Sequence, residues 1–154
     1  LLAEISNSVH ALDFSEGMLQ QARQKLKQQH IRFDIADVSK PWPVSVASYD
    51  LIVCNLVLEH IEDLAPVFQQ ANDSLRAGGQ FYVSELHSFR QYQGGKARYQ
   101  QGEQTIEVEA YIHHVSDFLQ AARQQNLSLV NFHEHWHAED VGKPPRLATF
   151  LFRK

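Results

Sequence analysis

The sequence has 154 residues, of which 44% are hydrophobic and 21% are charged, and this composition suits one globular domain with its own core. The 14 Lys and Arg residues stand against 18 Asp and Glu, so the formal net charge of -4 disfavours nucleic-acid binding through bulk electrostatics. No apolar run approaches the length needed to cross a membrane, and the amino terminus has no basic segment followed by an apolar one. We therefore expect a soluble, cytoplasmic protein.

The first elements alternate between helical and strand periodicity. Residues 1–8 are typical of the end of a helix, and 9–13 (VHALD) are typical of a strand. From Ser15 the apolar residues keep helical spacing, with the Ser15 side chain placed to cap the first turn. Residues 31–35 (IRFDI) alternate between apolar and polar and predict a second strand.

The middle of the chain predicts a strand, a helix and another strand. Residues 49–55 form a continuous apolar run that is typical of a strand buried on both faces, and the single cysteine, Cys54, is expected there as a buried thiol. A helix is expected over 64–75, with Gly78 and Gly79 as its C-terminal stop. The segment QFYVSEL, residues 80–86, is the following strand.

The last third predicts a hairpin over 97–112 that turns at Gln101 and Gly102, and then a helix over 115–125. Two more strands are expected, over 127–136 and 147–152. Strands that alternate with helices indicate an α/β fold, in which a mostly parallel sheet carries helices on both faces. We expect one domain over the whole chain.

Four stretches carry a family resemblance. They are HALDFSEGMLQQAR, FDIADV, YDLIVCNLVLEHIED and LRAGGQFYVSEL, in this order. Together they resemble the class I S-adenosylmethionine-dependent methyltransferases, in particular their small-molecule branch, from residue 1 to about 86 and more loosely to 154. The resemblance implies a Rossmann-like sheet whose last strand, over 147–152, runs antiparallel. It also implies S-adenosylmethionine as the cofactor and a small molecule as the methyl acceptor.

By this resemblance, three strand ends supply the cofactor contacts. Asp13 would accept hydrogen bonds from both ribose hydroxyls, and Phe14 and Met18 would provide apolar surface beside the adenine. Asp37 would accept a hydrogen bond from the adenine amino group, while the backbone amide of Val38 meets a ring nitrogen. A helix-capping role for Asp13, a core position for Met18 and a turn-capping role for Asp37 remain open alternatives.

The third strand end would face the methionine part of the cofactor through Asn55 and Leu56, although Asn55 also suits an ordinary turn. His60 and His87 are the candidates for removing a proton from the acceptor. His113 and His114 are further candidates, and a structural role remains open for each of the four histidines. Because the sulfonium already activates the methyl group, a general base is optional.

Residues 87–113 correspond to the family's cover over the substrate pocket. Their aromatic and cationic content suits a small anionic or aromatic acceptor, and equally a surface hairpin. No metal site is expected. The stretch from Asn55 to His60 lacks the first acid of the Glu-x-x-Glu-His pattern found in quinone O-methyltransferases, and His133, His135 and His137 lie too far apart along one strand face to share an ion.

The position of Asp13 leads to a further expectation. Such an acid normally follows a glycine-rich loop by about 20 residues, yet only twelve residues precede it and none is glycine. We therefore expect an N-terminally truncated domain that lacks its first strand and loop. We expect it to be less stable than its parent and to bind the cofactor weakly or not at all. A non-catalytic binding or regulatory module and, less in keeping with the motifs, an NAD-dependent oxidoreductase remain alternatives, and the oligomeric state stays open.

Overall fold

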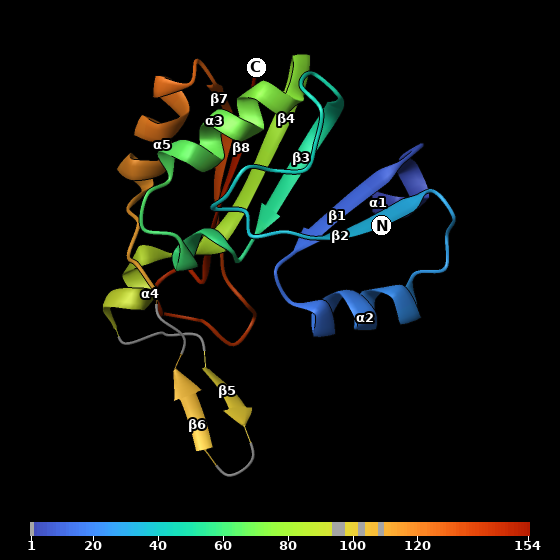
Figure 1. The fold of residues 1–154 in the computed structure, drawn as a ribbon. Coiled ribbons are helices and arrows are strands. Elements are labelled where there is room, and N and C mark those ends of the chain that lie inside the picture. The colour runs from blue at the N-terminus through green and yellow to red at the C-terminus, as the bar shows by residue number, and fades with distance from the viewer. Residues whose placement is uncertain (1, 94–97, 102–103, 108–109) are drawn as a thin grey trace. The chain divides into compact units, whose positions relative to one another are not determined.

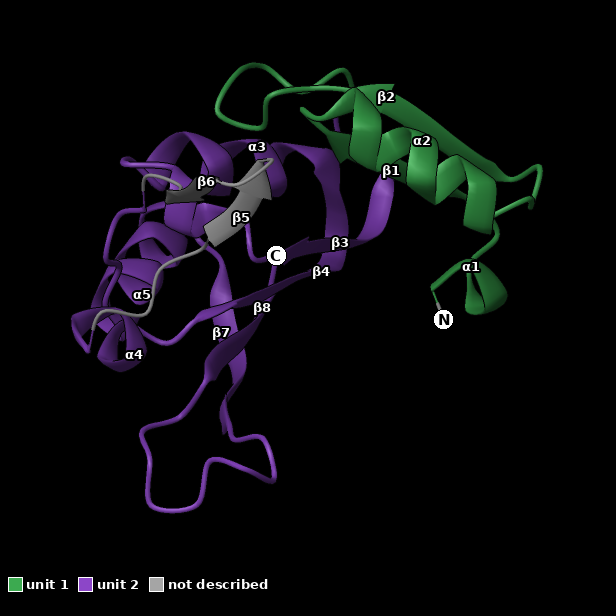
Figure 2. Ribbon diagram, turned by 90° about the horizontal axis from the view of Figure 1, so that it is seen from below, with its two compact units in different colours: residues 1–44 green, residues 45–154 purple. Residues whose placement is uncertain are grey.

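The computed structural model describes residues 2–93, 98–101, 104–107 and 110–154, and of these 98–101 and 104–107 are described by their backbone alone. Residues 1–44 and 45–154 form two compact units (Figure 2). Unit 1 contains α1 (Leu2–Ile5), β1 (Val9–Asp13), α2 (Glu16–Lys25) and β2 (Ile31–Ile35). Unit 2 contains β3 (Tyr49–Asn55), η1 (Leu58–His60), α3 (Ala65–Ser74), β4 (Leu75–Leu86), α4 (Ser88–Tyr92), β5 (Arg98–Gln101), β6 (Gln104–Glu107), α5 (Val115–Gln124), β7 (Ser128–His135) and β8 (Leu147–Arg153).

Unit 1 is a strand–helix–strand motif. The strands β1 and β2 pair in parallel, with Val9 opposite Ile31 and Asp13 opposite Ile35. Ser15 caps α2 as predicted, because its hydroxyl oxygen accepts a hydrogen bond from the backbone N–H of Met18 at 3.3 Å. The carboxyl ends of both strands, where polar residues follow, therefore lie at the same edge of this small sheet.

Unit 2 is built on a four-stranded sheet in the order β3-β4-β8-β7 (Figure 1). The strands β3 and β4 are parallel, and β8 runs antiparallel to both of its neighbours, β4 and β7. The predicted α/β fold with an antiparallel last strand is thus confirmed. Because β4 and β7 both oppose β8, they end at the same edge of the sheet, and β3 ends there too.

The core of unit 2 is an aromatic cluster between this sheet and two helices, α3 and α5. Phe68 of α3 meets Phe81 of β4 and Phe152 of β8 edge to face, with ring centroids 5.2 and 5.6 Å apart. The ring centroid of Phe118 of α5 lies 4.8 Å from that of Phe150 of β8. These aromatic side chains are all at most 3% exposed. Apolar burial on this face supplies the main stabilising free energy of the unit.

The opposite face of β3 is more exposed than the sequence predicted. Leu51 and Val53 alternate along the strand with Ile52 and Cys54. The side chains of Leu51 and Val53 are each 41% exposed. The prediction of a strand buried on both faces is therefore wrong for these two positions. The physical reason is that the helices packed on the described sheet, α3 and α5, cover the face that carries Phe81. Cys54 is half-buried and unbonded to another cysteine.

The two glycines after α3 also differ from prediction. The helix ends at Ser74, and β4 begins at once with Leu75, so Gly78 and Gly79 lie inside a strand. Gly78 has a φ of +78°, and a Cβ on Gly79 would stand 2.9 Å from the carbonyl oxygen of Arg76. The glycines therefore serve the irregular start of the β3–β4 pairing, where Tyr49 pairs with Leu75 and the register then shifts.

The hairpin predicted over 97–112 is present as the antiparallel pair β5 and β6, in which Gln101 pairs with Gln104. Gly102, half of the predicted turn, lies outside the described residues. The described helices are all too short and too polar to span a membrane.

Candidate functional site

Asp13 closes β1 and enters the turn before α2. One carboxylate oxygen, Oδ1, accepts a hydrogen bond from the backbone N–H of Ser15 at 2.8 Å. The other oxygen has no hydrogen-bond partner among the described residues, so Asp13 can both shape this turn and accept from a ligand. Phe14 and Met18 beside it are 78% and 56% exposed, which excludes Met18 from the core of unit 1.

Asp37 follows β2 in the same unit. Its Oδ1 accepts two hydrogen bonds from Ser39, one from the hydroxyl at 2.6 Å and one from the backbone N–H at 2.9 Å. These bonds hold the pKa of Asp37 below its usual value, so the group is an anion at neutral pH. The indole of Trp42 donates to the carbonyl oxygen of Val38 at 2.9 Å, whereas the N–H of Val38 has no partner among the described residues.

The end of β3 leads into residues 55–58, which we call the Asn55 turn. Asn55 is exposed, and Leu56 is 44% exposed with a φ of 54°, a left-handed conformation that is unusual for leucine. Three consecutive backbone N–H groups then bond to β4. Leu56 donates to the carbonyl oxygen of Ser84 at 2.9 Å, and Val57 and Leu58 donate to Glu85 Oε1 at 3.0 and 3.1 Å.

Glu85 is a functional candidate that the sequence analysis missed. Its side chain is 1% exposed, and Oε2 is buried without a hydrogen-bond partner among the described residues. Burial raises the pKa of Glu85 to about 7, although the N–H groups of Val57 and Leu58 oppose the rise and the nearby charge of Glu59 adds to it. The sequence alone could have indicated Glu85, because this acid shares its strand face with Phe81 and Val83, which point into the core.

The two histidines proposed for proton removal have different surroundings. The side chain of His60 is 31% exposed, and its Nε2 lies 3.8 Å from Glu59 Oε1. His87 is buried and engaged at both ring nitrogens. Nδ1 accepts from the N–H of Phe89 at 3.1 Å, which makes Nε2 the protonated nitrogen that donates to Glu134 at 2.9 Å. His87 therefore already serves as the N-cap of α4.

The other two candidate histidines also have contacts within the chain. His113 Nε2 lies 2.7 Å from the carbonyl oxygen of Ile61, and His114 Nε2 lies 3.0 Å from the hydroxyl of Tyr92. These contacts attach the segment before α5 to η1 and α4, which favours a structural role for both.

Residues 1–83, more than half of the chain, match the model of a family described as a methyltransferase domain. The chain belongs to this methyltransferase family. No curated protein sequence matches it significantly.

Solved structures of low sequence identity share the methyltransferase fold. An S-adenosylmethionine dependent methyltransferase from Mesorhizobium loti is 21% identical, with a TM-score of 0.81 over 97% of this chain and 81% of that chain. An S-adenosylmethionine-dependent methyltransferase from Clostridium acetobutylicum is 19% identical, with a TM-score of 0.79 over 99% of this chain and 77% of that chain. At these identities the likeness establishes the fold.

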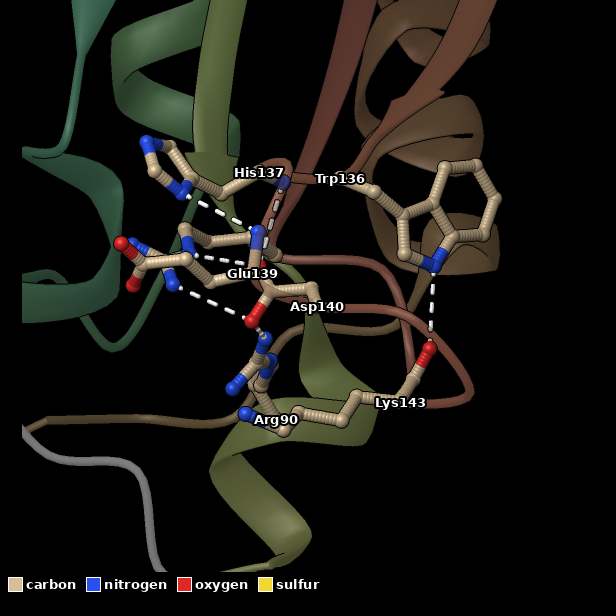
Figure 3. Close-up of polar contacts among 7 residues, drawn as sticks. Arg90, Trp136, His137, Glu139, Asp140 and Lys143 are labelled. Atoms are coloured by element: carbon tan, nitrogen blue, oxygen red, sulfur yellow. Dashed lines mark hydrogen bonds and ion pairs between the residues drawn. The ribbon is translucent and has the colours of Figure 1, made fainter.

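In unit 2, a polar cluster at the sheet edge where β3, β4 and β7 end joins α4 to the loop between β7 and β8 (Figure 3). Asp140 is 1% exposed and accepts hydrogen bonds from Arg146 Nε and Nη2 at 3.0 and 3.1 Å. Arg90 of α4 forms an ion pair with the same carboxylate, and the N–H of His137 donates to it. The hydrogen bonds from Arg146 hold the pKa of Asp140 well below its usual range. We call these four residues the Asp140 clamp.

The loop held by the clamp lines a shallow, open hollow of about 360 Å³ with Trp136, His137, Ala138, Asp140, Val141 and Gly142. The hollow is formed within the loop itself, and sequence periodicity gave no sign of it or of the clamp. Within the described parts of the methyltransferase, no group of three or more His, Cys, Asp or Glu side chains is arranged to hold a metal ion. Burial raises the pKa of the Cys54 thiol well above its usual range, so this cysteine is not an activated nucleophile.

Proposed function

We propose that this methyltransferase binds S-adenosylmethionine and transfers its methyl group to a small-molecule acceptor. The observation that carries the proposal is the set of polar groups at the carboxyl ends of β1, β2 and β3, in a chain of the methyltransferase family. Ligands of open α/β sheets bind at such strand ends.

The chemistry of these groups fits the cofactor part by part. Asp13 has a carboxylate oxygen available for ribose hydroxyls, and the exposed Phe14 and Met18 offer apolar surface to an adenine ring. Asp37, an exposed anion, suits the adenine amino group, and the N–H of Val38 suits a ring nitrogen. We assign these five residues to the nucleoside part.

Asn55 and Leu56 are assigned to the methionine part. Both are exposed at the end of β3, and the backbone of the turn is fixed to β4 from behind. The bound cofactor supplies a methyl group that is already activated by its sulfonium. The protein therefore has to align the acceptor and exclude water.

His60 is the residue that we propose for removing a proton from the acceptor, because its side chain is partly exposed beside the Asn55 turn. His87 would have to release the N–H of Phe89 or the carboxylate of Glu134 to act as a base. We therefore assign His87 to holding α4, the start of the proposed cover over residues 87–113. The net charge of -4 favours a small molecule over nucleic acid as the acceptor.

Calorimetry with S-adenosylmethionine tests the cofactor assignment, using the full product of the reading frame that contains these residues. Asp13→Ala should weaken binding by about 1.5 to 3 kcal/mol, the range for hydrogen bonds to a charged group. Asp13→Asn keeps an acceptor for the N–H of Ser15 but loses the carboxylate, so it should weaken binding almost as much. If Asp13→Asn binds as tightly as the unaltered protein, Asp13 acts only in the turn.

Release of S-adenosylhomocysteine over a panel of small carboxylates, phenols and amines tests the transfer itself. Asp50→Asn, the same chemical change at a carboxylate whose side chain is 82% exposed, is the matched control and should leave binding and turnover unchanged. Tight cofactor binding without turnover over the panel would favour a regulatory module. Absence of cofactor binding by the full product would overturn the proposed function.

A further inference from the structure

Two consecutive residues of β4 accept the hydrogen bonds that three N–H groups of the Asn55 turn donate. Ser84 accepts the N–H of Leu56 through its carbonyl oxygen, and Glu85 accepts the next two N–H groups through a single carboxyl oxygen. Three consecutive N–H groups of the turn are therefore directed at one strand. The arrangement leaves the side chains of Asn55 and Leu56 directed to the exposed side.

This arrangement maintains an unfavourable backbone conformation. A leucine with a φ of 54° is strained, and such strain persists only where neighbouring contacts determine the backbone. The contacts that do so are the hydrogen bond to Ser84 before the strained peptide and the two bonds to Glu85 after it. Glu85 therefore determines the geometry of a turn that it does not itself belong to.

The position of Glu85 is costly for stability alone. A carboxyl group that is 1% exposed, with one oxygen unpaired among the described residues, loses much of its hydration without full compensation. The charge of Glu59 of η1 adds to this cost, although its backbone N–H partly offsets it, and Cys54 of β3 is a neutral thiol. An apolar side chain at position 85 would continue the face of Phe81 and Val83 without these costs.

We propose that Glu85 is a positioning residue for cofactor binding. It holds the N–H groups of Val57 and Leu58 so that Asn55 and Leu56 are presented in one fixed conformation to the methionine part of S-adenosylmethionine. Glu85 does this without touching the cofactor. The inference rests on the proposed function.

Two substitutions separate this role from a general contribution to stability. Glu85→Gln keeps the shape and a carbonyl acceptor but loses the charge, so it should weaken cofactor binding by about threefold to tenfold. Glu85→Leu removes the acceptor altogether and should weaken binding by more than about tenfold. Since Glu85→Leu also ends the burial of a carboxyl group, the loss of affinity should exceed any loss of stability.

Calorimetry with S-adenosylmethionine and urea denaturation are therefore performed on the same samples of the full reading-frame product. Glu62→Gln, which removes the charge of an exposed acid near the same turn, is the control and should change affinity less than twofold. If Glu85→Leu does not fold, the affinity of Glu85→Gln alone tests the inference. Binding within twofold of the unaltered protein by every folded Glu85 variant would overturn the inference.

Hydrogen exchange in the absence of cofactor distinguishes failure of the proposed function from failure of the inference about Glu85. The N–H groups of Val57 and Leu58 should exchange faster in Glu85→Leu than in the unaltered protein, while the N–H groups of β8 keep their protection. If the unaltered protein binds no cofactor, the proposed function is wrong, and so is this role of the Asn55 turn. If the unaltered protein binds but the exchange of Val57 and Leu58 does not respond to Glu85→Leu, only the inference about Glu85 is wrong.

Discussion

Unit 1 and unit 2 use the same strand-and-helix alternation but place their apolar side chains differently. In unit 1 the one buried hydrophobic side chain among the described residues is Leu19, and Phe14, Met18 and Ile35 are more than half exposed. In unit 2 the aromatic side chains meet in a core under α3 and α5. The difference shows that periodicity predicts an element, whereas a second layer packed on it decides whether its apolar residues form a core or stay exposed.

The largest expected effect concerns the core of unit 2. Phe68→Ala should lower the free energy of unfolding by about 3 to 5 kcal/mol, because it removes a ring that is 0% exposed and touches two strands. Urea denaturation measures the loss, and hydrogen exchange locates it. Leu19→Ala is the matched change in unit 1 and should mainly expose the N–H groups of β1 and β2. Identical exchange patterns for both variants would contradict the division into two units.

The next largest expected effect comes from a buried titratable group, Glu85. Among the described residues, the buried acids lie in unit 2. The pKa of Glu85 is raised by burial from its usual 4.5 to about 7, so between these pH values the folded protein binds more protons than the unfolded one. The free energy of unfolding should therefore fall as pH rises from about 4.5 to 7, by on the order of 3 kcal/mol at most, and level off above pH 7.

Urea denaturation at pH 5, 6, 7 and 8 should show that Glu85→Gln lacks this part of the slope, because an amide does not titrate. Glu62→Gln should keep the slope of the unaltered protein. Equal slopes for Glu85→Gln and the unaltered protein would show that Glu85 titrates normally.

The smallest effect belongs to unit 1. Ser15→Ala removes the hydroxyl that accepts from the N–H of Met18, so it should destabilise α2 by about 1 kcal/mol or less. Hydrogen exchange measures this destabilisation, which should appear as faster exchange confined to the first turn of α2. The control Ser15→Asp should preserve protection, because aspartate is an equally good cap. A loss of protection in β4 or β8 after Ser15→Ala would mean that the two units unfold together.

Much of the fold could be predicted because its signals are local. The alternation in 31–35, the helical spacing after Ser15 and the apolar run of 49–55 each matched an observed element. The error at Gly78 and Gly79 has a tertiary cause. A glycine pair after a helical pattern predicts a helix stop. Here Gly78 is required by its φ of +78°, and Gly79 by the close carbonyl oxygens of Arg76 in β4 and Tyr49 in β3.

The site was only partly accessible from the sequence. Residues at strand ends, such as Asp13 and Asn55, could be named because the carboxyl edge of an α/β sheet is fixed by topology. The exposure of Leu51 and Val53 could not be predicted, because it depends on which face of the sheet the helices cover. Asp140 and its partners were missed because Arg90 and Arg146 are brought together by the fold from positions far apart in the sequence.

The place of β8 has a consequence for synthesis. This strand comes last among the elements, yet it lies inside the sheet, with β4 on one side and β7 on the other. Gln80 pairs with Arg153, and β7 reaches the rest of the sheet only through β8. A ribosome must therefore deliver residues 147–153 before the sheet can close, and until then β4 presents an open edge and a half-covered aromatic core. During that interval the open edge and the exposed aromatic side chains favour self-association of the growing chain.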